Sequence, residues 1–417
     1  MKHPLNIVNP SPETCVKCKG RMWCGPKCYV LEKYSVYEKT ASQFKGTSFE
    51  GSSPPGFFVS HYSYPKVNVA PMSPTEHLKN ASILDDSDKW FGMSEDKIIS
   101  FRQQLVRSNS QFEVNSASDP SRNLMDIQEL VMAKDATDVN IELKKKPRFD
   151  ISFSDTAAPM GPTGELKKFS LDSNPSVDKK VDYMVSDVDV KSNVAMRELF
   201  EYGIGVNQLH KLLSAGLLGV KKSRRLTPTR WSIVAVDDSL SKYLLDSIKY
   251  YSQVDEVQLF SASYLGNNFH ILIYPGSWCF EQLEAWFPGG VWTEQAKEPN
   301  ITSDHEFYTG KKGYAENVTG AYYSARLAIC EYLEKIKRQA SVIVFREITP
   351  EYKLALGVWV IRNSVRDAMS SKPITFGDLS LALDYLGKKL NIPIKYWQKE
   401  SKLLDDVKNQ KRLFDFV

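Results

Sequence analysis

The chain has 417 residues, 42% of them hydrophobic and 25% charged, which is ordinary for a soluble globular protein and enough to bury a large core. It contains no run of about 18 or more apolar residues, which argues against a membrane-spanning helix. The N-terminal sequence MKHPLNIVNPSPETC lacks the apolar region of a signal peptide, so we expect a cytoplasmic protein.

The net charge of +4 is unevenly distributed. Residues 1–48 hold eight Lys or Arg residues against three acids, a net charge of +5, so the rest of the chain is about neutral. A basic N-terminal module of this kind is typical of contact with a polyanion. A solvated charged surface explains the same charge equally well.

The first half of the chain predicts short strands followed by helices. Residues 49–75 are rich in Pro, Gly and Ser, and two short strands are predicted there between turns, at 57–62 and 66–70. Apolar residues at helical spacing predict helices over 94–110, with Ser94 as a plausible N-cap, and over 123–134. Residues 137–153 alternate as a strand does, and the turn-rich stretch 155–185 predicts a long ordered loop.

The second half repeats this mixture. The predicted elements are a helical stretch at 191–215, a buried strand at 230–237, a hairpin over 257–276 turning at Gly266-Asn267-Asn268, a short helix at 280–287, an amphipathic helix at 319–340, a strand at 341–348, and a helix at 376–390 with Gly387 near its end. Helices and strands alternate without regular βαβ phasing. We therefore expect an α+β fold with one core domain at 49–395, between a small module at 1–48 and a tail at 396–417.

The tail ends in a short motif, QKRLFDFV. Leu413 and Phe416 follow Gln410 at three and six residues, and residues three apart eclipse in a 3₁₀ turn, so both apolar side chains would project together. Gln410 offers donors and acceptors for a separate polar pocket, and Val417 adds a weaker apolar end. This resembles the peptide that binds the sliding clamp PCNA (the PIP motif), which has a second aromatic residue where Val417 stands. The alternative is a helix end that packs on its own core.

Four of the six cysteines lie within fourteen residues, which argues for metal binding in a reducing compartment rather than for disulfides. The ligands would be Cys15, Cys18, Cys24 and Cys28. Four thiolates suit the tetrahedral preference of a structural Zn²⁺, and an iron–sulfur cluster is the alternative. Cys279 and Cys330 are isolated in apolar surroundings, so we expect them to be buried and inert.

Cations and aromatic residues alternate with these cysteines. Trp23 and Tyr29 stand among Lys17, Lys19, Arg21 and Lys27. Such interleaving suits phosphate contact and base stacking, so DNA is an expected partner. Equally, the two aromatic side chains would simply cover the metal site.

A second polar constellation lies in RRLTPTRWSIVAVDD at 224–238. Asp237 and Asp238 at a strand end would be positioned to hold Mg²⁺ or Mn²⁺, with His270 as a further catalytic candidate, and Arg225 and Arg230 are candidates for binding phosphate or nucleic acid. Less specific candidates are Asp187, Asp189, His210 and His305. The alternative is that these residues have only structural roles. The two aspartates would then cap a following helix, the arginines would pair with them, and His270 would be a core residue.

Several blocks of sequence together resemble the Nre family of archaeal DNA repair proteins. They are CVKCKGRMWCGPKC at 15–28, YPKV at 64–67, APMGP at 158–162, LSAGLLG at 213–219, RRLTPTRWSIVAVDD at 224–238, GAYYSARLAICEYL at 320–333, GVWVIR at 357–362 and the terminal motif. The resemblance covers nearly the whole chain. It implies a role in the repair of DNA damage and binding to the sliding clamp, and it implies no settled catalytic mechanism.

The sequence therefore favours a DNA repair factor that the clamp recruits and whose zinc module contacts DNA or a partner. The alternative is a metal-dependent nuclease or phosphohydrolase acting on DNA or nucleotides. A third hypothesis is an adaptor without contact to nucleic acid. Whether the core is catalytic stays open at this point.

Overall fold

The computed structural model describes residues 39, 40, 42, 44, 46–148, 160–290, 293 and 296–409. The four clustered cysteines and the terminal motif from Gln410 onward lie outside them. The described residues form two compact units, the first ending at Leu240 and the second beginning at Ser241. The boundary falls inside the 49–395 range that we expected to form one core. Both units combine a mixed sheet with helices, as the α+β prediction requires.

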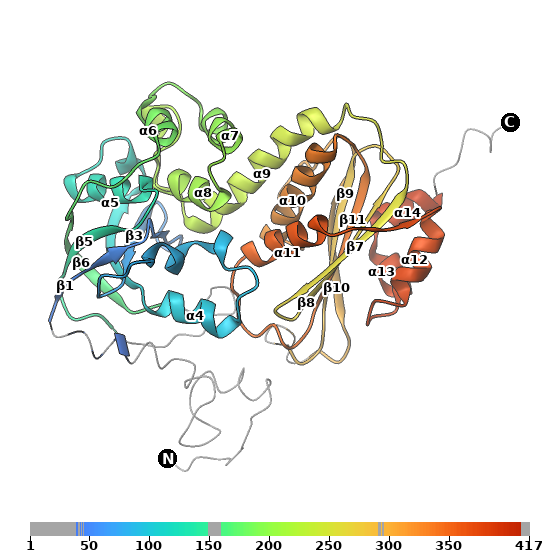
Figure 1. Cartoon of the computed structure of the whole chain (residues 1–417), viewed down its shortest axis with the longest axis horizontal. Helices are drawn as coiled ribbons and strands as arrows, with labels where there is room; N and C mark the ends of the chain where they lie inside the picture. Colours follow the sequence, from blue (N-terminus) through green and yellow to red (C-terminus); the bar gives the residue numbers. More distant parts are fainter. Residues whose placement is uncertain are drawn as a thin grey trace, which may run out of the picture. The chain divides into compact units, whose positions relative to one another are not determined.

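The first unit contains a six-stranded sheet in the order β1-β5-β6-β4-β3-β2 (Figure 1). Its strands are β1 (Ser48–Ser53), β2 (Phe57–Val59), β3 (Lys66–Ser73), β4 (Val106–Glu113), β5 (Thr137–Leu143) and β6 (Thr163–Leu171). Neighbouring strands are antiparallel except β4 and β6, which are parallel. In β5, buried and partly exposed residues alternate without interruption, which is the period that predicted this strand.

Helices make up the rest of the regular structure in the first unit. They are α4 (Glu95–Gln103), α5 (Arg122–Met132), α6 (Lys179–Ser186), α7 (Ser192–Tyr202), α8 (Val206–Ser214) and the first part of α9 (Thr229–Ile248), with 3₁₀ turns η1 (Ala81–Asp85), η2 (Ser87–Lys89), η3 (Val114–Ala117) and η4 (Lys221–Ser223). Ser94 caps α4, and its side chain accepts a hydrogen bond from the amide of Lys97, as predicted. The helix is shorter than the predicted 94–110, because β4 begins at Val106.

Two predictions in this unit were wrong. The stretch 155–185 is not one long loop, because it contains β6 and the start of α6. Residues 230–237 form part of α9 and not a buried strand. Buried positions along α9 recur four residues apart, at Ser232, Val236 and Leu240, which is the helical period. A short apolar run such as SIVAV fits either structure when its partners are unknown.

The second unit has its own six-stranded sheet, in the order β10-β9-β11-β8-β7-β12. Its strands are β7 (Val257–Tyr264), β8 (Asn267–Tyr274), β9 (Cys279–Trp286), β10 (Asn300–Glu306), β11 (Ser341–Ile348) and β12 (Ile374–Phe376). Only β9 and β11 pair in parallel among these neighbours. The predicted hairpin is confirmed, but its turn lies at Leu265 and Gly266, both at positive φ, and Asn267 and Asn268 already belong to β8.

The predicted helix at 280–287 was wrong, because residues 280–286 belong to β9. Phe280 and Leu283 are spaced as on a helix face, whereas the strand places them on opposite faces of the sheet. Glu281 and Gln282 lie between them and Glu284 follows Leu283, and all three are buried, a pattern that is atypical of a strand.

Helices cover both faces of the second sheet (Figure 1). They are α10 (Gly320–Ile336), α11 (Trp359–Ser370), α12 (Leu379–Gly387), α13 (Ile394–Glu400) and α14 (Lys402–Asn409). On one face, Leu283 and Phe345 pack against α12, α13 and α14 in a core that includes Trp397. On the other face, the ring of Phe280 lies 5.1 Å from that of Tyr322 on α10. In the described part of the chain, no helix has the length and apolar character that crossing a bilayer requires.

Candidate functional site

The last described helix, α14, is fastened to the second sheet by a buried carboxylate. Glu281, on β9, accepts hydrogen bonds from the Ser401 hydroxyl and from the amides of Lys402 at 2.8 Å and Leu403 at 3.2 Å. The Ser401 hydroxyl in turn accepts from the amide of Leu404 at 3.1 Å. Three of the amides at the start of α14, which have no partner within the helix, are thereby bonded to side chains.

The charge of Glu281 fits this position. A negative charge at a helix N-terminus interacts favourably with the helix dipole. Burial raises the pKa of Glu281 above its ordinary value, and the hydrogen bonds from Ser401, Lys402 and Leu403 oppose that rise by stabilising the carboxylate. Leu403 and Leu404 are buried in the core beside Trp397, so burial and capping fix the same helix. Asn409, at its end, directly precedes the terminal motif.

Asp237 and Asp238, predicted as catalytic, lie on α9 in the first unit and not at a strand end. Asp237 is fully buried and Asp238 is half-buried. Adjacent helical residues are about 100° apart around the axis, so the two carboxylates leave the helix in different directions. Among the described residues, no three His, Cys, Asp or Glu side chains lie close enough to hold a metal ion. Asp187 closes the turn after α6 by accepting from the amides of Asp189 and Val190.

The arginines of the same block divide into two kinds. Arg224 donates to the backbone carbonyls of Gly219, Val185 and Asp187, and burial lowers its pKa. Arg225 and Arg230 are exposed, and neither forms an ion pair with another described residue. The predicted pairing of these two arginines with the neighbouring acids is therefore not seen, and both guanidinium groups face solvent.

His270 lies on β8 in the second unit, whereas the α9 aspartates belong to the first unit. Its Nδ1 is 2.8 Å from the hydroxyl of Ser261 on β7. Burial, with a smaller contribution from Lys389, lowers the pKa of His270 from 6.5 to about 4, so the ring is neutral at pH 7. A serine hydroxyl beside a neutral imidazole forms two parts of a nucleophilic triad. Within the described residues, no carboxylate is bonded to the other ring nitrogen.

The remaining candidate histidines are also largely withdrawn from solvent. His210, on α8, is buried. His305, on β10, is half-buried with its ring 5.3 Å from that of Phe307, and burial lowers its pKa. Neither belongs to a cluster of metal-binding side chains in the described part of the chain.

Two buried arginine–glutamate pairs lie in the second unit. Arg346, on β11, donates to Glu284 on β9 at 2.6 Å, and Arg326, on α10, donates to Glu306 on β10 at the same distance. The indole of Trp278 also donates to Glu306, at 2.9 Å. Since breaking such a buried pair leaves an uncompensated charge, these residues hold the sheet and α10 in register.

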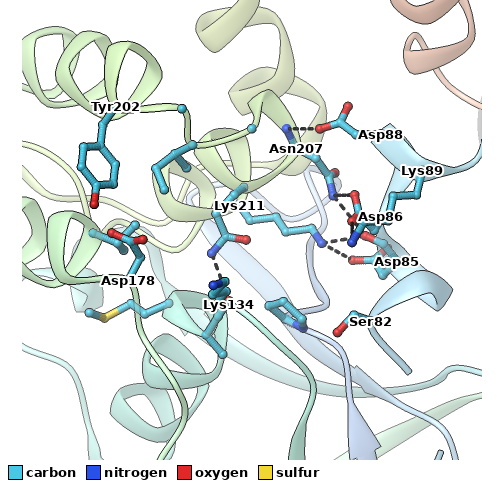
Figure 2. A pocket seen from close by; sticks show the side chains of 18 residues that line it. Ser82, Asp85, Asp86, Asp88, Lys89, Lys134, Asp178, Tyr202, Asn207 and Lys211 are labelled. Atoms are coloured by element: carbon cyan, nitrogen blue, oxygen red, sulfur yellow. Dashed lines mark hydrogen bonds and ion pairs between the residues drawn. The ribbon is translucent and has the colours of Figure 1, made fainter. Parts of the chain in front are cut away.

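Sequence reasoning missed a polar cavity of about 390 Å³ in the first unit (Figure 2). It lies between the 3₁₀ segment from Ala81 to Lys89, the end of α5 and the start of α8. Its side chains include lysines, aspartates, an asparagine and a tyrosine. The labelled members are Ser82, Asp85, Asp86, Asp88, Lys89, Lys134, Asp178, Tyr202, Asn207 and Lys211.

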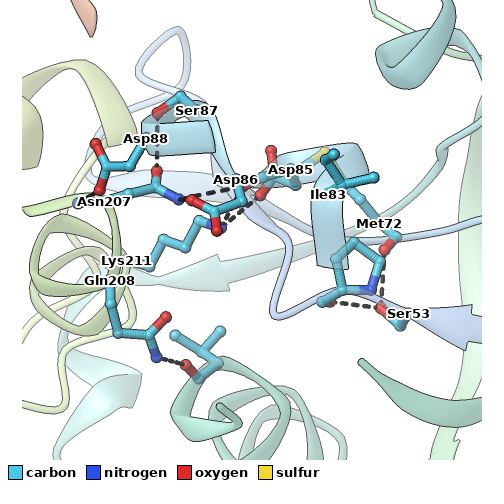
Figure 3. Close-up of polar contacts among 12 residues, drawn as sticks. Ser53, Met72, Ile83, Asp85, Asp86, Ser87, Asp88, Asn207, Gln208 and Lys211 are labelled. Carbon is cyan, nitrogen blue, oxygen red and sulfur yellow. Dashed lines mark hydrogen bonds and ion pairs between the residues drawn. The ribbon is translucent and has the colours of Figure 1, made fainter. Parts of the chain in front are cut away.

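The acids of this cavity are bonded within the protein (Figure 3). Lys211 forms an ion pair with Asp85 at 2.8 Å, and Asp86 pairs with Lys89 at 2.9 Å. Asn207, on α8, donates its side-chain amide to Asp86 at 3.4 Å and its backbone amide to Asp88 at 3.3 Å. The contacts hold the 3₁₀ segment against the start of α8. The run LDDSDK is the one sequence signal that could have drawn attention to this place.

The chain matches two family descriptions over most of its length. Residues 23–293 match the family described as "Archaeal Nre, N-terminal", and residues 306–416 match "Archaeal Nre, C-terminal". The chain belongs to the Nre family of archaeal DNA repair proteins. The resemblance inferred from the sequence blocks is thereby confirmed.

Full-length Nre relatives cover most of the chain. It is 33% identical to the DNA repair protein NreB of Archaeoglobus fulgidus over 403 residues, which are 97% of this chain and 100% of the relative. It is 34% identical to NreA of the same organism over 90% of this chain and 93% of the relative. Identity to NreA of Haloferax volcanii is 36%, over 80% of this chain and 82% of the relative. No solved structure matches the chain.

The two Nre segments do not coincide with the two structural units. The N-terminal segment continues past Leu240 to residue 293 and so includes β7, β8 and β9 of the second sheet. The C-terminal segment contributes β11, which lies between β8 and β9. Neither Nre segment can therefore complete the second sheet without the other.

The lowered pKa of His270 predicts a pH-dependent stability. Between pH 6.5 and about 4 the unfolded chain binds a proton at this ring and the folded chain does not, so the free energy of unfolding falls as pH falls. The full effect is about 3 kcal/mol. Chemical denaturation of wild type and His270→Gln at pH 7 and pH 4.5 measures it. The variant should lose less stability over this range than wild type, and equal losses would contradict the assignment.

Proposed function

We propose that this Nre protein acts in DNA repair as a factor that the sliding clamp PCNA recruits through residues 410–417. The observation that carries the proposal is the place of the motif in the chain. It begins one residue after Asn409, at the end of a helix that Glu281 and a buried leucine pair fasten to the second unit. A peptide that continues from a fixed helix end is presented by the folded unit at a defined point.

The residue types of the motif suit a clamp surface. In a single 3₁₀ turn, Leu413 and Phe416 project side by side as an apolar plug, and Gln410 reaches a separate polar pocket. Val417 gives a weaker apolar end than an aromatic residue would. A short peptide of this kind binds in the micromolar range, about −8 kcal/mol. Affinity of that order suits recruitment that must be reversible.

The second part of the proposal concerns the basic N-terminal module. Cys15, Cys18, Cys24 and Cys28 are proposed as ligands of one structural Zn²⁺, and the surrounding cations and aromatics as a surface that contacts DNA or a partner. A segment this short cannot bury enough surface to fold by itself, so the metal would supply its stability. The naming of the relatives as DNA repair proteins supports DNA as the partner.

The clamp motif predicts a specific loss on substitution. Phe416→Ala removes the aromatic half of the apolar plug and should weaken clamp binding at least tenfold, roughly 1.4 kcal/mol or more. Calorimetric titration of the full-length protein with the clamp measures the affinity. Asp415→Ala, at a position between the two anchors, is the matched control and should change the affinity little. Unchanged affinity of Phe416→Ala would refute the proposal.

The zinc module predicts a stoichiometry. The purified chain should contain one zinc ion, and Cys24→Ser should release it, because a hydroxyl replaces a thiolate ligand. Cys279→Ser is the control: burial raises the pKa of the Cys279 thiol, so it is a poor source of thiolate. Elemental analysis distinguishes the outcomes. Full zinc content in Cys24→Ser, or iron in its place in the wild type, would overturn the zinc assignment.

A further inference from the structure

Large aromatic side chains lie exposed on the first unit, at the loop between β2 and β3 and at the start of α9. Tyr62 is 82% exposed, Tyr64 47% and Trp231 48%. Exposed aromatic residues that cluster on a folded surface mark a binding site more often than scattered ones do. We call Tyr62, Tyr64, Trp231 and half-buried His61 the aromatic surface.

The four rings form two packed pairs. The ring of Tyr64 lies 5.2 Å from that of Trp231, although the two residues come from different elements. The ring of His61 lies 4.2 Å from that of Tyr62, with the planes tilted by 30°. Each pair leaves ring area open to solvent. Two such pairs, one in the loop between β2 and β3 and one joining that loop to α9, can therefore accept planar groups from successive units of a polymer.

Backbone hydrogen bonds fix both segments that carry the rings. The amide of Val59 donates to the hydroxyl of Thr229 at 2.9 Å, which joins the end of β2 to the first residue of α9. The amide of Val114 donates to the carbonyl of Pro65 at 3.0 Å, and that of Leu226 to the carbonyl of Val114 at 2.8 Å. The two backbone segments that carry the rings are thus held together before any ligand arrives, which lowers the entropic cost of binding.

Exposed cations lie close to Trp231 in the sequence. Arg230 directly precedes Trp231 and is exposed, as are Arg225, Lys221 and Lys222 earlier in the same segment. Arg225 and Arg230 form no ion pair with another described residue. Lys66 forms an ion pair with Glu113 at 3.5 Å, so its charge is largely neutralised. The nearest acids along α9 are the buried Asp237 and the half-buried Asp238, nearly two helical turns beyond Trp231.

We propose that the aromatic surface binds single-stranded DNA, with unpaired bases stacked on Trp231, Tyr64 and Tyr62 and phosphates held by Arg230 and Arg225. Stacking on aromatic rings beside a basic groove is how proteins bind unpaired strands without reading their sequence. Paired bases keep their faces inside the duplex and cannot use the rings in this way. The choice of DNA as the strand rests on the proposed repair function.

The test is fluorescence anisotropy of the full-length protein with a labelled oligothymidylate, the matching duplex, and oligouridylate. The wild type should bind the single DNA strand at least tenfold more tightly than the duplex. Trp231→Ala and Tyr62→Ala should each weaken single-strand binding about tenfold, and Trp231→Phe should restore most of the affinity because it keeps a ring. Tyr183→Ala removes a tyrosine of α6 that is 61% exposed, and it should change binding less than twofold.

Salt dependence tests the phosphate contacts separately. Arg230→Gln and Arg225→Gln should each lower the slope of log affinity against log salt concentration by about 0.7, as expected for one phosphate contact on a single strand. Unchanged binding by Trp231→Ala would overturn the proposal, and so would equal binding of duplex and single strand. Tighter binding of the RNA strand than of the DNA strand would overturn the choice of DNA.

The test of single-strand binding and the test of clamp binding can fail independently. Trp231→Ala should leave clamp affinity unchanged, because the substitution lies far along the chain from residues 410–417. Phe416→Ala should leave binding of the oligothymidylate unchanged. Loss of DNA-strand binding in Phe416→Ala would contradict the independence of the two sites. Failure of clamp binding alone would leave the proposal for the aromatic surface supported.

Discussion

The buried carboxylate of Glu281 is the contact on which the arrangement of the C-terminal region depends. A carboxylate removed from water is costly unless donors replace its hydration. Ser401, Lys402 and Leu403 supply those donors, and in return the start of α14 gains partners that it lacks by itself. One strand residue thereby sets the point, after Asn409, from which the proposed clamp peptide continues.

The same dependence on distant partners explains which elements the sequence predicted. β5 alternates between buried and partly exposed residues, and the hairpin of β7 and β8 turns at a glycine, so local pattern was sufficient for both. β9 was mistaken for a helix because its acids are buried. Glu281 and Ser401 are 120 residues apart in the sequence, and no local period reveals such a pair.

The candidate sites were predicted to different extents for the same reason. Arg225 and Arg230 were selected for their charge, and both are exposed as an anion-binding role requires. Their aromatic neighbours escaped notice, because Val59 and Thr229, the residues whose contact joins the two segments, are 170 positions apart. Asp237 was selected for its type, and its burial on a helix could not be inferred from an apolar run that suits strands and helices alike.

Hydrogen–deuterium exchange of the full-length protein, with and without the sliding clamp, tests most directly whether the clamp binds residues 410–417. If it does, the amides of residues 411–417 should exchange at least about tenfold more slowly once the clamp is added. The amides of α14 should be unaffected, because Glu281 already holds that helix in the free protein. Equal exchange of residues 411–417 in both states would contradict the account, whatever other segments the clamp protects.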